Sequence, residues 1–365
     1  MTWTRAVLLT CFVAGIDIPV SEDPKSEIAT DGRYDFVVSI PDIHGDLDVL
    51  LRALWIAAVE VDGLIDTPDF DVFRLSVAKQ VEASDIAEEL EDVKPLSNSR
   101  VLLVNTGDIV DRGPKSLSCY KAIWAAERVL GWTLINLIGN HEVMTIAGQA
   151  DLYAHPDDIS EFGGIKARRA QFGRGGKLWK KITDDFRFML RVSVGTNDST
   201  LFVHAGIDPA WLNVMTKKGF TSVLQMNTFL TAELKRNPLS EFISAVDSPV
   251  WTRHLAEDPD ASVCQSSLSK VLAFFNVNRI VVGHTPQKSL RTMARCNGQL
   301  LLADVAMSRW MGSGKFGNPS AMIFVLSDAG SVLQRTYNVY WNHHEQKTNS
   351  QVLFEKDKAD SYFEL

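Results

Sequence analysis

The stretch Val101-Leu-Leu-Val-Asn-Thr-Gly-Asp-Ile-Val-Asp-Arg-Gly113 predicts both a buried strand and a functional site at its end. Its first four residues are apolar, which favours a strand inside a sheet. The strand runs directly into a turn that carries Asp108, Asp111 and Arg112 between two glycines. A carboxylate at the end of a buried strand is costly unless a positive charge accompanies it. We therefore expect these carboxylates to face a cation.

Two other stretches repeat this arrangement. A β-branched run at 36–40 is followed by Asp42-Ile-His44, and an apolar run at 132–138 is followed by Gly139-Asn140-His141-Glu142. A helical pattern follows the first of these turns and the turn after 101–104. Repeated strand, charged turn and helix are typical of a parallel α/β sheet with its site at the carboxyl ends of the strands.

The second half of the chain adds two histidines in the same context. His204 follows the strand expected at 199–203, and His284 follows the strand expected at 279–282. A single histidine after a buried strand is more often a hydrogen-bonded core residue than a ligand. Two of them, together with the three polar turns, predict metal ligation.

Composition limits the classes of function. The 365 residues are 45% hydrophobic and 22% charged, which suffices for a large core. The 37 basic and 45 acidic residues give a net charge of −8, which disfavours a nucleic-acid partner. No stretch reaches the length of a confident membrane span, so we expect no stable one.

The N-terminus resembles a short secretory signal, because Arg5 precedes an apolar run that ends in small residues. The alternative is a first buried strand or helix. With a signal we expect the secretory pathway or an organelle lumen, and without one the cytoplasm. The expected organisation is a signal segment at 1–20, a linker at 21–34, a domain at 35–345 with an acidic insertion at 62–99, and a polar tail at 346–365. Within the insertion, the pattern between Val77 and Val93 predicts an acidic amphipathic surface helix.

Four cysteines, Cys11, Cys119, Cys264 and Cys296, form no closely spaced pair. We expect buried or half-buried thiols rather than a zinc site or a dense disulfide framework. The basic stretch at 166–181 predicts a solvated helix face, or alternatively a positive rim that attracts anionic substrates.

These motifs together resemble the calcineurin-like metallophosphoesterase superfamily, and within it the phosphoprotein phosphatases. Further matches at Val250-Trp-Thr-Arg253, Ile280-Val-Val-Gly-His-Thr-Pro-Gln287 and Asp304-Val-Ala-Met-Ser-Arg309 resemble the Shewanella-like protein phosphatases. Two features depart from the family pattern. Pro41 stands where the first motif has glycine, and the insertion at 62–99 is longer than expected.

The resemblance implies a four-layer α-β-β-α sandwich with a dinuclear metal centre at the strand ends. One metal would be held by Asp42, His44 and Asp108. The other would be held by Asp108, Asn140, His204 and His284, with Asp108 bridging. These oxygen and nitrogen ligands suit two divalent ions, with Mn²⁺ preferred and Fe or Zn²⁺ as alternatives.

The resemblance also implies hydrolysis of a phosphomonoester by a hydroxide that bridges the two metals. His141 would act as the general acid, oriented by Asp111. Arg112, Asn140 and Arg253 would bind the phosphate.

The motifs are compatible with more than one substrate class. The subfamily favours a phosphorylated protein, with phosphoserine, phosphothreonine or phosphotyrosine as the target. The alternatives are a diadenosine tetraphosphatase-like hydrolase and, more remotely, a scaffold that binds phosphoproteins without hydrolysis.

Overall fold

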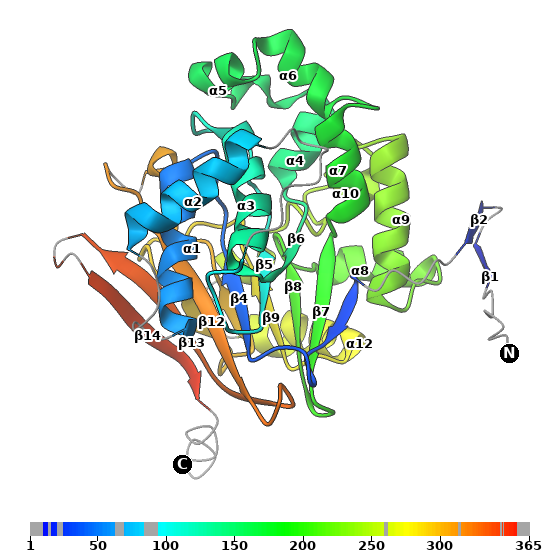
Figure 1. The fold of residues 1–365 in the computed structure, drawn as a ribbon. Coiled ribbons are helices and arrows are strands. Elements are labelled where there is room, and N and C mark those ends of the chain that lie inside the picture. The colour runs from blue at the N-terminus through cyan, green and yellow to red at the C-terminus, as the bar shows by residue number, and fades with distance from the viewer. Residues whose placement is uncertain are drawn as a thin grey trace, which may run out of the picture.

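The computed structural model describes residues 10–13, 16–19, 25–62, 69–83, 94–258, 262–312, 315–343, 345 and 347–355. Within these residues, two six-stranded sheets carry helices on their outer sides (Figure 1). The first sheet has the order β14-β13-β12-β4-β5-β6 and the second the order β10-β11-β9-β8-β7-β3. In chain order the strands of the first sheet are β4 (Phe36–Ile40), β5 (Val101–Asn105), β6 (Thr133–Asn136), β12 (Ser320–Ser327), β13 (Val332–Asn342) and β14 (Lys347–Glu355). Those of the second are β3 (Glu27–Ala29), β7 (Met189–Val194), β8 (Asp198–Val203), β9 (Arg279–Val282), β10 (Met293–Arg295) and β11 (Leu300–Leu302).

The helices connect these strands. They are α1 (Leu47–Asp62), α2 (Phe70–Ala83), α3 (Ser116–Leu130), α4 (Asn140–Ile146), α5 (Pro156–Glu161), α6 (Ile165–Phe172), α7 (Lys177–Asp185), α8 (Pro209–Lys217), α9 (Val223–Arg236), α10 (Glu241–Ser244), α11 (His254–Glu257) and α12 (Ser269–Phe275). Helices α1 and α3 pack on the first sheet, and α9 packs on β7 of the second (Figure 1).

The apolar core has two layers because side chains alternate along each strand. Val37 and Leu102 point between the sheets, into a cluster that contains Val281 of the second sheet. Val38 and Leu103, one residue further along each strand, belong to the larger cluster beneath the helices. Helices, sheet, sheet and helices therefore form four layers, and the expected α-β-β-α sandwich is confirmed.

The strand directions bring the polar turns to one edge. β4, β5 and β6 are parallel, and β8 and β9 are parallel in the other sheet. The turns approach one another so closely that two glycines have no room for a side chain. A Cβ on Gly139 would collide with the carboxylate of Asp108, and one on Gly283 would collide with that of Asp42.

Three parts of the expected organisation differ from the structure. Residues 27–29 of the expected linker form β3, which pairs in parallel with β7. Residues 347–355 of the expected polar tail form β14, the edge strand beside β13. Both are short or polar edge strands, whose sequences lack the apolar pattern of a buried strand. The helix of the insertion, α2, begins at Phe70, whereas residues 84–93 lie outside the described residues.

The predicted signal segment lies mostly outside the described residues. In it the structure gives only β1 (Thr10–Val13) and β2 (Ile16–Pro19), which pair with each other. The signal and the compartment stay predictions. Among the helices of the described residues, none is long and apolar enough to cross a bilayer.

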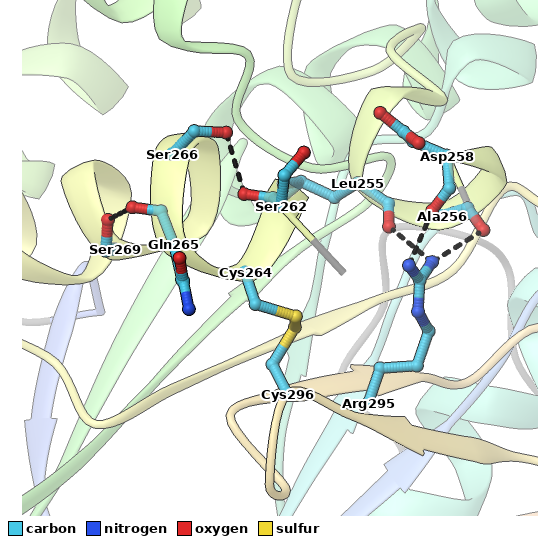
Figure 2. Close-up of a disulfide and its surroundings, with 10 residues drawn as sticks. All are labelled: Leu255, Ala256, Asp258, Ser262, Cys264, Gln265, Ser266, Ser269, Arg295 and Cys296. Carbon is cyan, nitrogen blue, oxygen red and sulfur yellow. Dashed lines mark hydrogen bonds between the residues drawn. A yellow bond between two sulfur atoms is a disulfide. The ribbon is translucent and has the colours of Figure 1, made fainter. Parts of the chain in front are cut away.

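The expectation of free thiols is wrong for two cysteines. Cys264 and Cys296 form a disulfide with a Cα–Cα distance of 5.5 Å, whereas Cys119 is a buried free thiol. The bond joins the segment before α12 to the turn after β10 (Figure 2). Beside it, Arg295 donates to the carbonyls of Leu255 and Asp258. The two cysteines are 32 residues apart, so only the tertiary fold reveals the pairing.

We expect the double substitution Cys264→Ser and Cys296→Ser to lower the free energy of unfolding. Opening a loop of this length costs about 3–4 kcal/mol in the chain-entropy account. Urea unfolding of the variant and of the native protein, each with and without a thiol reductant, measures the effect. The reductant should lower the stability of the native protein alone. A variant as stable as the oxidised native protein would contradict the prediction.

Candidate active site

Asp108 lies at the centre of the polar edge. Its Oδ1 accepts a hydrogen bond from the backbone N–H of His141 at 2.9 Å. Its Oδ2 lies 3.7 Å from Nε2 of His44 and 3.5 Å from Nε2 of His204. One carboxylate oxygen therefore stands between histidines that come from the two different sheets.

Two groups of potential metal ligands share Asp108. One contains His44 and His141, and the other contains His204 and His284, with all ligand atoms of a group within 4.8 Å of one another. The amide oxygen of Asn140 lies 3.0 Å from Nε2 of His204. The structure thus brings together five of the six predicted ligands around two adjoining positions.

Asp42, the sixth predicted ligand, lies beside these groups and not within them. Its Oδ1 accepts from the hydroxyl of Thr106 at 3.2 Å, and its Oδ2 accepts from the backbone N–H of His284 at 3.0 Å. It is buried, and the negative charge of Asp108 contributes to its raised pKa, so the two carboxylates interact.

The histidines have the protonation state that a metal ion needs. Nδ1 of His204 donates to the carbonyl of Thr106 at 2.8 Å, so Nε2 carries no proton. The lone pair of Nε2 faces the amide oxygen of Asn140. Two acceptors that face each other repel, and a cation that both of them bind would remove this repulsion. Nε2 of His284 is buried without a hydrogen-bond partner among the described residues. Burial lowers the pKa of His204 to about 3 and that of His284 further, so both are neutral at pH 7.

Burial and mutual repulsion both disfavour the ionised forms of the carboxyl groups at the site. Burial raises the pKa of Asp42 and Asp108 well above the ordinary value, and the charges of neighbouring carboxylates raise it further. Added positive charge beside carboxyl groups shifted in this direction stabilises their ionised form. Neutral imidazoles, an amide oxygen and crowded carboxylates therefore fit divalent metal ions.

His141 and Arg112 lie together at the ligand group that contains His44. Nδ1 of His141 is 2.8 Å from Oδ2 of Asp111, and its Nε2 is 3.5 Å from Nη2 of Arg112. Burial, with Arg112 and Arg168 nearby, lowers the pKa of His141 to about 3. Nε of Arg112 is buried and has no hydrogen-bond partner among the described residues, so this guanidinium can bind an anion.

Arg253 reaches the site from the start of α11. Its Nη1 donates to the carbonyl of His284 and to the hydroxyl of Thr285, each at 3.2 Å. The side chain is 41% exposed, so it stands at the rim beside the second group of ligands. The sequence alone did not indicate which way this arginine points.

The turns that carry these side chains have unusual backbone conformations. Five site residues lie in the left-handed region, with φ between 47° and 71°: His44, Asp108, Asp111, Arg112 and His284. Such conformations cost of order 1–3 kcal/mol each and persist only where the surroundings impose them. Glu142 supplies part of that constraint, because its carboxylate accepts from the backbone N–H groups of Asp108, Ile109 and Gly139.

Sequence reasoning assigned no role to three buried charged residues at the site. They are Glu142, Arg168 and Asp304. Asp304 follows β11 at the same edge as the ligands, and its Oδ2 has no hydrogen-bond partner among the described residues. Its pKa is raised to about 6 by burial, which Arg253 and Arg112 oppose. The same strand-end rule that selected His204 and His284 could have found Asp304.

Comparisons with known proteins agree with this geometry. The calcineurin-like phosphoesterase family matches residues 37–288. Shewanella-like protein phosphatase 2 of Arabidopsis thaliana is 24% identical over 355 residues, which cover 83% of this chain and 79% of that protein. Shewanella-like protein phosphatase 1 of Plasmodium berghei is 25% identical over 229 residues, 59% of each chain.

A solved structure shares the fold. The crystal structure of a cold-active protein-tyrosine phosphatase from a psychrophilic Shewanella species superposes with a TM-score of 0.59. The two sequences are 20% identical, and the match covers 90% of this chain and 82% of the Shewanella chain. The resemblance to the Shewanella-like phosphatases is confirmed by these relatives. Because the family match spans most of the chain and the ligand groups are assembled, the chain belongs to the calcineurin-like phosphoesterase family and is a phosphatase of the hydrolase class.

Proposed function

We propose that this enzyme removes phosphate from phosphorylated proteins, with two divalent metal ions, Mn²⁺ first among them. The observation that carries the proposal is the position of Asp108 Oδ2 between His44 and His204. One metal would be held by Asp42, His44 and Asp108, and the other by Asp108, Asn140, His204 and His284. Two such ions would supply an activated water as the nucleophile and positive charge for the phosphoryl oxygens.

The remaining side chains would bind the substrate and move a proton. Arg112 lies beside His141 and Arg253 lies beside His284, so the two guanidinium groups would hold phosphate oxygens, together with the amide of Asn140. His141 would donate its Nε2 proton to the departing oxygen, while Nδ1 would keep its own proton and donate it as a hydrogen bond to Oδ2 of Asp111. The low pKa of His141 belongs to the substrate-free protein, and a dianionic phosphate beside the ring favours its protonated form.

A protein substrate is supported by the relatives. Two of them are named Shewanella-like protein phosphatases, and the structural neighbour is a protein-tyrosine phosphatase. Tyr153 contacts His141 and Arg112, and it is exposed together with its neighbour Leu152, so a protein substrate could contact apolar surface beside the site.

Removing the metals with a chelator should lower the stability of the enzyme, and Mn²⁺ should restore it. A ligand that binds only the folded state adds about 2.7 kcal/mol at 100 times its dissociation constant. The substitution Asp108→Asn should abolish this increment, because the shared anionic ligand is lost. Thermal unfolding with and without Mn²⁺ measures it, with the exposed Asp71→Asn as the control. An increment that persists in Asp108→Asn would contradict the metal assignment.

The substrate class can be tested with a panel of phosphopeptides and diadenosine tetraphosphate. In the presence of Mn²⁺ we expect release of inorganic phosphate from the peptides and much slower turnover of the dinucleotide. Peptides phosphorylated on serine, threonine or tyrosine then rank the preference. Inertness toward every phosphopeptide, with rapid turnover of the dinucleotide, would overturn the proposed substrate.

The substitution His141→Ala should slow turnover in proportion to the need of the leaving oxygen for a proton. We expect a loss of about 10²–10⁴-fold for phenyl phosphate, the usual range for general acid catalysis, and a smaller one for p-nitrophenyl phosphate. Steady-state kinetics on both substrates and metal analysis of the variant test this role. If the bound metal falls together with the activity, His141 is a ligand instead.

A further inference from the structure

We propose that Arg168 is a positioning residue for the reaction: it fixes the carboxylate of Asp111 and, through it, the imidazole of His141. The inference rests on the proposed role of His141 as the general acid. Arg168 belongs to α6, in the basic stretch for which the sequence predicts a solvated face. The structure differs there, because Arg168 is among the largest fully buried side chains.

The guanidinium of Arg168 bridges two carboxylates from different elements. Its Nη2 donates to Oδ1 of Asp111 at 2.5 Å, and its Nε donates to Oδ2 of Asp158 at 2.9 Å. Asp111 lies in the turn after β5, and Asp158 lies in α5. Both carboxylates are fully buried, so neither faces bulk solvent.

The two oxygens of the Asp111 carboxylate thereby have different partners, and the hydroxyl of Thr145 also donates to Oδ2 at 3.4 Å. Oδ1 is held by Arg168, which leaves Oδ2 for Nδ1 of His141 at 2.8 Å. With one oxygen fixed, the carboxylate cannot turn about its Cβ–Cγ bond without breaking an ion pair. The ring of His141 is consequently aimed with Nε2 toward Arg112, where a phosphate would lie.

The network closes on the backbone of the same turn. Oδ1 of Asp158 accepts from the backbone N–H of Ser116 at 2.8 Å, and the hydroxyl of Ser116 accepts from the N–H of Asp111 at 3.1 Å. Arg168 thus holds the side chain of Asp111 directly. Through Asp158 and Ser116 it also holds the backbone of Asp111. That backbone is left-handed, with φ of 71°, and needs such a constraint.

Arginine suits this position better than lysine. The planar fork presents separate N–H groups to two acceptors, whereas an ammonium group is a single point of charge. The rings of Phe162 and Phe172 lie 5.7 and 5.4 Å from the guanidinium carbon, within range of a cation–π interaction. Neighbouring Arg169, by contrast, is exposed and pairs with Asp151. Arg169 therefore provides a matched control.

The test compares Arg168→Gln and Arg169→Gln on p-nitrophenyl phosphate and phenyl phosphate, with metal content measured for each. We expect Arg168→Gln to lower kcat for phenyl phosphate roughly 10–100-fold more than kcat for p-nitrophenyl phosphate, a part of the general acid contribution. KM and metal content should stay unchanged, and Arg169→Gln should match the native enzyme. In a His141→Ala background, Arg168→Gln should cause no further loss, because both act through one group.

Equal losses on the two substrates would overturn the inference, since a merely structural role slows both alike. A further loss in the His141→Ala background would also overturn it. If His141→Ala itself shows no dependence on the leaving group, the proposed role of His141 fails, and the role of Arg168 fails with it. If Arg168→Gln does not fold, Arg168→Lys takes its place. We expect the same selective loss there, and equal losses again refute the proposal.

Discussion

The site depends on the hydrogen bonds that the buried carboxylate of Glu142 makes. It accepts from the backbone N–H groups of Asp108, Ile109 and Gly139, and from the hydroxyl of Tyr120 at 3.0 Å. One side chain therefore joins the turn after β5 to the start of α4 and to α3. Without these bonds, three backbone donors would be buried without partners, at about 1–3 kcal/mol each. Glu142 makes the turns of two neighbouring strands into one rigid unit.

Around this unit the charges are arranged by sign. The middle of the site is rich in carboxylates and neutral imidazoles, and its margins carry Arg112 and Arg253. Burial opposes the ionised carboxylates and the protonated histidines alike. The protein therefore has an unfavourable charge distribution that bound cations would relieve. Such local conflict is expected where a chain is built for binding and not for its own stability.

The sequence predicted the main features of this arrangement because they follow local rules. Apolar runs that end in Asp42, Asp108, Asn140 or His204 identify strand ends, and parallel strands bring those ends together. The burial of Arg168 was missed because charge pattern in a short helix does not reveal burial. The bond between Cys264 and Cys296 was missed because the pairing depends on tertiary structure. The strand β14 was missed because a polar edge strand resembles a tail.

The left-handed residues of the site bear on protein engineering. His44, Asp108, Asp111, Arg112 and His284 all have positive φ, which few side chains tolerate outside a matched surrounding. Their side chains point correctly only because the backbone takes these shapes. Copying the same residue types onto the strand ends of another α/β scaffold would reproduce the composition without the geometry. A designer would need to transplant the turns complete, together with a counterpart of Glu142 to hold them.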